Sequence, residues 1–174
     1  MQSPSAYSFI RYVINEHYPY YAYKEFKCRY KGYSKLFCKI GRLLFRLSNY
    51  WQPEVFLANT ELFDGFVNAG CVKTTCLPLS AAIVDEDSAK EYGALSGHHI
   101  IFVDVRTFKG DVNKLLGVCT VDTMLIMAGL FPKHKNVWHE IKESKFTGVT
   151  YNLYYCGIVF FDKSKYKQHY EVNF

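Results

Sequence analysis

The stretch GHHIIFVDV, residues 97–105, contains the clearest strand in the sequence. From His99 to Val105 the residues are apolar or β-branched with little interruption, which is typical of a strand buried on both faces. Farther along the chain, the run from Val149 to Phe161 is aromatic and β-branched throughout. It predicts a long central strand or a hairpin, with Gly157 at a bulge. We expect these two segments to form the core of a sheet.

Before these strands, apolar residues recur at helical spacing and predict an amphipathic helix. Ser34 is a suitable N-cap for this helix, and Pro53 marks where it must have ended. Lysines and arginines follow the same spacing on another face of the helix. The apolar positions are Leu36, Phe37, Ile40, Leu43, Leu44 and Leu47.

Shorter helices are predicted in four other places. Thr60 can cap a helix that Gly70 closes, and acidic residues 85–87 suit the start of a helix from Ser88 to Leu95. The apolar run from Thr120 to Leu130 is interpreted as a helix, and Asn136 would cap a further one from Val137 to Ser144.

Together these elements predict an α+β fold in which several helices surround a mainly antiparallel sheet. An amphipathic basic helix lies near the N-terminus. The 174 residues contain no repeat or low-complexity linker, so we expect a single domain over residues 1–174. Within it, residues 1–52 form a basic helical front and residues 53–174 a mixed α/β core.

Composition narrows the class of protein. With 49% apolar and 21% charged residues, the chain is neither disordered nor fibrous. It lacks the roughly 18 uninterrupted apolar residues of a membrane span, and residues 1–10 show no signal peptide. The six cysteines are not spaced as a disulfide framework, so we expect free thiols in the cytoplasm, a reducing compartment. No cofactor is expected, and no metal site, because Cys71 and Cys76 have no second ligand pair.

The most informative chemistry lies between residues 97 and 144, where Cys119 directly precedes the predicted helix from Thr120. A cysteine at a helix N-terminus has its thiolate stabilised by free backbone N–H groups and the helix dipole. A nearby imidazole would hold the thiolate ready and later protonate the leaving group. His98 and His99 open the buried strand and are the candidates for this base. The alternative interpretation is a core cysteine beside a pair of strand-entry histidines.

These segments resemble the permuted papain-like cysteine hydrolases of the NlpC type. The matching stretches are GHHIIFVDV (97–105), GVCTVDTMLIMAGL (117–130) and NVWHEIKES (136–144). The resemblance implies a thiol hydrolase, active or decayed, that cuts peptide, amide or ester bonds, from a family common in phages and bacteria. Cys119 takes the place of the nucleophile, and His98 or His99 that of the base. About 20 residues separate histidine and cysteine, where that family usually has further strands.

A second resemblance is to mono-ADP-ribosyltransferases and implies a degenerate NAD-binding fold. It rests on LPLSAAIVDEDSAKEYGALSGHHIIFVDV (77–105) and on VDTMLIMAG (121–129), which is similar to the last strand of that family. The catalytic glutamate would fall near Thr123, with Asp122 beside it. The first strand, EVFLANT (54–60), lacks the expected arginine.

The third hypothesis is not enzymatic and concerns the basic front. Between residues 24 and 46, eight Lys or Arg residues stand against the single acid Glu25, a net charge of +7 in a chain whose total is +5. Such an excess of one sign favours binding of an acidic macromolecule, either nucleic acid or an acidic protein, although a solvated helix face is the plain alternative. Membrane-surface contact is less favoured, because Leu43 and Leu44 would have to leave the core. The predicted binding residues are Lys35, Lys39, Arg42 and Arg46 on the helix, and Lys24, Lys27, Arg29 and Lys31 before it, with Tyr23, Phe26, Tyr30 and Tyr33 interleaved.

Overall fold

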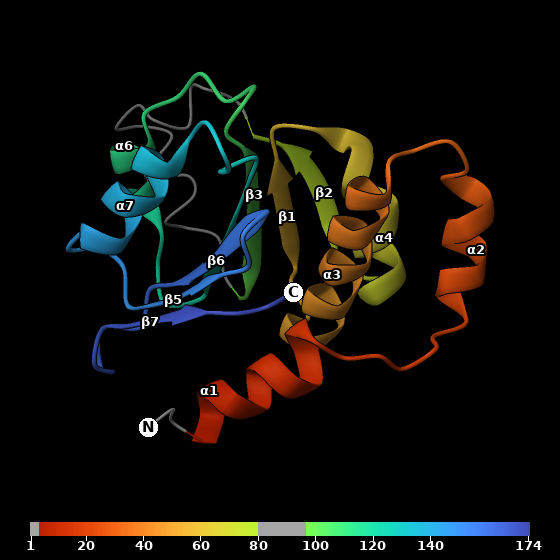
Figure 1. The fold of residues 1–174 in the computed structure, drawn as a ribbon, viewed down its shortest axis with the longest axis horizontal. Coiled ribbons are helices and arrows are strands. Elements are labelled where there is room, and N and C mark those ends of the chain that lie inside the picture. The colour runs from red at the N-terminus through yellow and green to blue at the C-terminus, as the bar shows by residue number, and fades with distance from the viewer. Residues whose placement is uncertain (1–3, 80–96) are drawn as a thin grey trace.

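The computed structural model describes residues 4–79 and 97–174, and its strands form one seven-stranded sheet (Figure 1). The order across the sheet is β2-β1-β3-β4-β6-β5-β7. The strands are β1 (Val55–Ala58), β2 (Thr75–Pro78), β3 (His99–Asp104), β4 (Thr123–Ala128), β5 (Val149–Asn152), β6 (Cys156–Phe160) and β7 (Gln168–Glu171).

Helices cover both faces of this sheet, so the fold has three layers (Figure 1). On one face, Leu44 and Phe66 pack in the same apolar cluster as Ile100 of β3. On the other face, Leu116 and Ile141 cluster with the neighbouring residue of β3, Ile101. The helices are α1 (Pro4–Phe9), the π-helix η1 (Ile10–Ile14), α2 (Ala22–Arg29), α3 (Lys35–Trp51), the 3₁₀-helix η2 (Glu61–Phe63), α4 (Asp64–Gly70), α6 (Val112–Val118) and α7 (Lys135–Glu143).

The α+β prediction is confirmed, but the prediction of a mainly antiparallel sheet is wrong. β2, β1, β3 and β4 run parallel to one another, and β5 and β7 are parallel to each other. Only the β4–β6 and β5–β6 pairs among the described strands are antiparallel. The reason lies in the connections: α4 separates β1 from β2 and α6 separates β3 from β4, and a crossover through a helix returns the chain in the same direction.

The prediction of a helix from Thr120 to Leu130 is also wrong, because the middle of this segment forms strand β4. Every residue from Thr123 to Ala128 is buried. A strand covered on both faces is apolar at each position and has no alternation, so periodicity does not separate it from a buried helix.

Most other predicted elements are confirmed. The side chain of Ser34 caps α3 by accepting a hydrogen bond from the Phe37 N–H, and the helix ends just before Pro53. The run from Val149 to Phe161 is the β5–β6 hairpin, but Gly157 pairs regularly with Met127 instead of forming a bulge. A Cβ atom at Gly157 would overlap the Trp138 ring. The predicted helix from Ser88 to Leu95 lies outside the described residues.

Close packing between α3 and α4 fixes the front of the molecule against the sheet. A Cβ atom at Gly41 would overlap the ring of Phe66, and one at Gly70 would overlap the backbone of Phe45. Both contacts require glycine for close approach, so the distance between the two helices is set by the absence of side chains at these positions.

We predict that Gly41→Ala lowers the free energy of unfolding by about 1–2 kcal/mol, because the methyl group overpacks against the fully buried Phe66. This is the net effect after the gain of about 1 kcal/mol in helix propensity, which offsets part of the overpacking. Urea unfolding gives the measurement. Gly117→Ala in α6 is the matched control, since its Cβ would have only ordinary contacts with Phe146, and it should be neutral or stabilising. Equal stability of the two variants would contradict the packing constraint.

Candidate functional site

Cys119 lies at the end of helix α6, not at the start of a helix as the sequence predicted. It is the C-cap of α6, and its Sγ donates a hydrogen bond to the Leu115 carbonyl oxygen at 3.2 Å. A helix C-terminus carries the negative end of the dipole and so does not favour a thiolate. Burial raises the pKa of the Cys119 thiol well above its ordinary range. The proposed activation of this cysteine therefore has no basis in its surroundings.

The two candidate histidines contact other groups. His98 stacks on Trp51, and its Nδ1 lies 2.9 Å from the Trp51 carbonyl oxygen. His99 is buried, with Nε2 2.7 Å from the hydroxyl of Thr123 and Nδ1 3.3 Å from the carbonyl oxygen of Gly97. Because a carbonyl can only accept, Nδ1 carries the proton and the neutral ring accepts from Thr123. Burial lowers the pKa of His99, which favours that neutral form.

No hydrogen bond in the described part of the chain joins Cys119 to either histidine. Asp122 is half-exposed, and its carboxylate lies 3.8 Å from His98 Nε2, whereas Thr123 is buried. The thiol-hydrolase and ADP-ribosyltransferase hypotheses stay predictions, and the local geometry adds no support for a nucleophile at Cys119.

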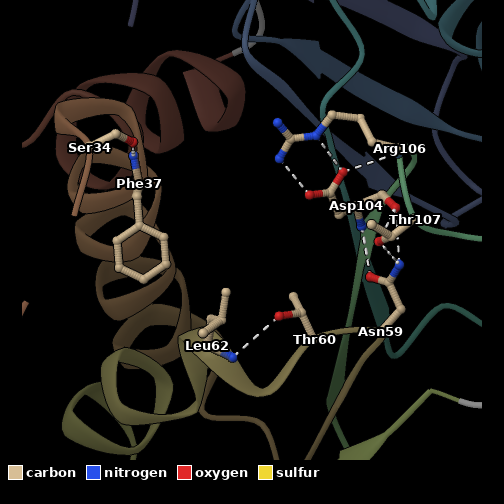
Figure 2. A network of polar contacts seen from close by, with 8 residues as sticks. All are labelled: Ser34, Phe37, Asn59, Thr60, Leu62, Asp104, Arg106 and Thr107. Carbon is tan, nitrogen blue, oxygen red and sulfur yellow. Dashed lines mark hydrogen bonds and ion pairs between the residues drawn. The ribbon is translucent and has the colours of Figure 1, made fainter.

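A polar network occupies the carboxyl ends of β1 and β3 (Figure 2). Open α/β sheets usually bind ligands outside such ends, at the point where successive connections run to opposite sides. In this sheet β2 pairs with one side of β1 and β3 with the other side. The carboxyl ends of β1 and β3 therefore lie at such a point. The side-chain amide of Asn59 accepts from the Asp104 N–H at 2.8 Å and donates to the Asp104 carbonyl oxygen and the Thr107 hydroxyl, at 3.0 and 3.1 Å.

Within this network the charges are already paired. Arg106 donates to both carboxylate oxygens of Asp104, at 2.9 and 2.6 Å. Burial acts to raise the pKa of Asp104, but the hydrogen bonds and charge of Arg106 outweigh it, so the pKa is lowered. The network ties β1 to the loop after β3 and uses its own donors and acceptors. The network fixes the backbone at the carboxyl ends of β1 and β3, and it leaves little unpaired charge for a ligand.

The basic front contains cations of two kinds, and the first kind is structural. Arg46 is only 7% exposed and donates to the carbonyl oxygens of Val13 and Ile14, both at 2.7 Å, and to the Tyr23 hydroxyl. Arg42 lies over the Tyr23 ring, and its Nε is buried without a partner among the described residues. Two of the four residues predicted as a stripe on α3, Arg42 and Arg46, are therefore not part of a solvated surface. Arg46 instead holds the end of η1 against α3.

Lys39 is exposed, but its side chain also contacts the C-terminal residue Phe174. Its Nζ donates to the Phe174 carbonyl oxygen at 2.6 Å and lies over the Phe174 ring. Of the four cations predicted along α3, Lys35 is thus the one without such a role. It is exposed at the first turn of the helix.

The second kind of cation forms a surface that we call the basic patch. It comprises five exposed side chains on α2, the following turn and the start of α3. In the described part of the chain none of them has an ion-pair partner or donates a side-chain hydrogen bond, although Arg29 lies over the Tyr30 ring. Figure 1 shows α2 at the outer side of α3, away from the sheet. The basic patch consists of Lys24, Lys27, Arg29, Lys31 and Lys35.

Stacked rings accompany the basic patch and form what we call the aromatic column. The ring of Phe37 stacks on Phe63, with centroids 4.7 Å apart, and on Tyr33, with centroids 4.4 Å apart. Phe63 is buried in the core, whereas Tyr33 is 48% exposed at the outer end of the column. Tyr21, which precedes α2, is 91% exposed. Two exposed tyrosines, Tyr21 and Tyr33, therefore lie close in sequence to the unpaired cations of the basic patch.

Sequence reasoning predicted the cations before α3 and Tyr33 among them, but it missed the stacking of Tyr33 on Phe37 and the role of Asn59. Tyr33 stacks on Phe37, and the other stacking partner of Phe37 is Phe63, which comes from a distant segment of the chain. Asn59 directly follows a short apolar run. Polar side chains in such a position often gather at the carboxyl ends of strands, so this position could have indicated Asn59. The described residues contain no group of three potential metal ligands.

We predict that Cys119 reacts slowly with iodoacetamide at neutral pH, on the order of tenfold or more slower than the exposed Cys28, because only the thiolate is nucleophilic. Mass spectrometry of labelled peptides over time gives the comparison. If Cys119 proved the fastest of the six cysteines, the nucleophile hypothesis would regain its basis.

We predict that Arg46→Gln lowers the free energy of unfolding by about 2 kcal/mol or more, because the buried carbonyls of Val13 and Ile14 lose their donor. Lys35→Gln removes the same charge from an exposed position of the same helix and should change stability by less than about 0.5 kcal/mol. Chemical unfolding of both variants provides the measurement. A small effect of Arg46→Gln would show that the guanidinium is dispensable.

In comparisons with known proteins, no family model matches the chain, and neither a curated protein nor a solved structure is similar to it. The contacts and charges of its own residues are therefore what bear on its function.

Proposed function

We propose that this protein binds single-stranded nucleic acid along α2 and the start of α3. The observation that carries the proposal is the basic patch itself: five exposed cations without acidic partners in the described residues, next to the exposed end of the aromatic column. Phosphates would replace the counterions that these side chains attract in solution, and the release of those ions favours binding.

Ring stacking favours a single strand over a duplex. A base-paired duplex hides the faces of its bases, whereas an unpaired base can stack on an exposed aromatic ring. Tyr33 already stacks on Phe37, so a base added at Tyr33 would extend the column. The buried end at Phe63 holds the rings in place before any ligand arrives.

Burial argues against a membrane surface as the partner. Insertion of α3 into lipid headgroups would need its apolar side to be free, but Leu43 and Leu44 are fully buried in the core. No described helix is both long and apolar enough to cross a membrane. Among acidic partners, single-stranded nucleic acid uses both the cations and the rings, whereas an acidic protein would use the cations alone.

The test is the affinity of the protein for fluorescein-labelled oligothymidine, measured by anisotropy at several salt concentrations. Replacing Lys24, Lys27, Arg29 and Lys31 by glutamine should weaken binding and make the salt dependence shallower, by roughly 0.7 in the slope of log K for each lost contact. Tyr33→Leu should weaken binding about tenfold with little change of that slope, because stacking does not release counterions.

Two matched controls separate these effects from net charge and from the mere loss of a tyrosine. Replacing four exposed lysines outside the basic patch, Lys109, Lys114, Lys133 and Lys135, removes the same charge and should leave most of the affinity. Tyr166→Leu removes a tyrosine that is 90% exposed and should leave binding unchanged. Equal losses in the two charge variants, or equal affinity for a duplex of the same length, would overturn the proposal.

A further inference from the structure

A cavity of about 580 Å³ lies on the face of the sheet that α1 covers, between that helix, the end of α3 and strands β5 and β6. Its walls are largely aromatic, and Phe9 packs against three of the other rings, with centroids 5.1–5.4 Å away. Small-molecule sites have volumes of roughly 300–1,000 Å³ and apolar walls, which this cavity matches. The aromatic wall residues are Phe9, Tyr50, Trp51, Tyr151, Phe160 and Tyr166.

Tyr151 is the largely buried residue of the wall whose polar group has no partner among the described residues. Tyr151 is 4% exposed, and its hydroxyl makes no hydrogen bond with any described residue. Two half-buried tyrosines of the described residues are paired by contrast: the Tyr20 hydroxyl donates to Glu16 at 2.7 Å, and the Tyr23 hydroxyl accepts from Arg46 at 3.0 Å. The hydroxyl oxygen keeps some accessible surface, so a ligand in the cavity can accept a hydrogen bond from Tyr151 in place of water.

Charge and size restrict the ligand. The two charged residues in the cavity wall, Asp162 and Lys165, pair with each other at 3.4 Å, so the cavity offers no net charge to an ion. An apolar cavity of about 150 Å³ suffices for one benzene ring, so a volume several times larger suits a fused ring system. Stacked and edge-to-face contacts with the aromatic rings of the wall favour a planar aromatic ligand over an aliphatic one.

We propose that this cavity binds an uncharged bicyclic heteroaromatic molecule, which packs among Phe9, Trp51 and Phe160 while one of its ring nitrogens accepts a hydrogen bond from the Tyr151 hydroxyl. This site is separate from the basic patch, because none of the patch residues lines the cavity. It does not depend on the proposed nucleic-acid binding.

The experiment titrates the full chain with two probes of the same shape, isoquinoline and naphthalene, and follows them by ligand-observed NMR. Isoquinoline carries a ring nitrogen and naphthalene does not. We expect saturable isoquinoline binding with a dissociation constant on the order of 0.1–1 mM. Tyr151→Phe removes one hydroxyl and should weaken isoquinoline about 3- to 10-fold while leaving naphthalene unchanged.

A second variant tests the position of the site without touching the core. Val121 lines the cavity and is 58% exposed, so Val121→Trp should fill the entrance and abolish binding of both probes while the far-ultraviolet circular dichroism stays unchanged. Val72→Trp is the control, because Val72 is 90% exposed and lies outside the cavity.

Three outcomes would overturn the proposal: absence of saturable isoquinoline binding, unchanged binding in Val121→Trp, or an equal effect of Tyr151→Phe on the two probes. Oligothymidine affinity measured on Val121→Trp keeps the two proposals distinguishable. That affinity should equal the affinity of the unaltered chain whether or not the cavity binds its ligand.

Discussion

The structure depends on one requirement: strands β1, β3 and β4 are apolar on both faces, so both faces must be covered. Ile100 and Ile101 are adjacent in β3 and point into different apolar clusters, one under α3 and α4 and one under α6 and α7. Each covering helix therefore has a fixed place. Because α3 has to pack on the sheet with its apolar side, its opposite side and α2 are left at the surface, and the cations of the front are divided accordingly.

Arg46 is a buried cation of the basic front, and its burial has both an energetic cost and a structural benefit. A buried guanidinium is tolerated when its donors are satisfied, and two backbone carbonyls at the end of η1 together with the Tyr23 hydroxyl satisfy this one. The same three bonds fix the segment that leads to α2. A residue that the sequence pattern assigned to a binding surface is thus structural, and four of the five cations of the basic patch lie before α3.

Much of the fold could be predicted from local patterns, and the site only in part. The spacing of Leu36 to Leu47 with Ser34 gave α3 almost to the residue, because capping and amphipathicity are local signals. The apolar run around Leu125 has no period, so its strand character follows only from burial on two faces, which is a property of the tertiary structure. The incorrect helix there also misplaced Cys119. Likewise, the stacking of Tyr33, Phe37 and Phe63 joins segments whose proximity no local pattern encodes.

The pairing of β1 with β3 also bears on how quickly the chain reaches its native state. Residues 55–58 align with residues 99–102, so this central pair joins segments that are far apart in sequence, whereas β5 and β6 join across a tight connection. Closing a long loop costs chain entropy before any contact compensates for it, and domains rich in such pairings fold more slowly than helical bundles of similar size. The β5–β6 hairpin can form on its own within microseconds. Its strand β6 would then offer an edge on which β4, and after it β3 and β1, assemble.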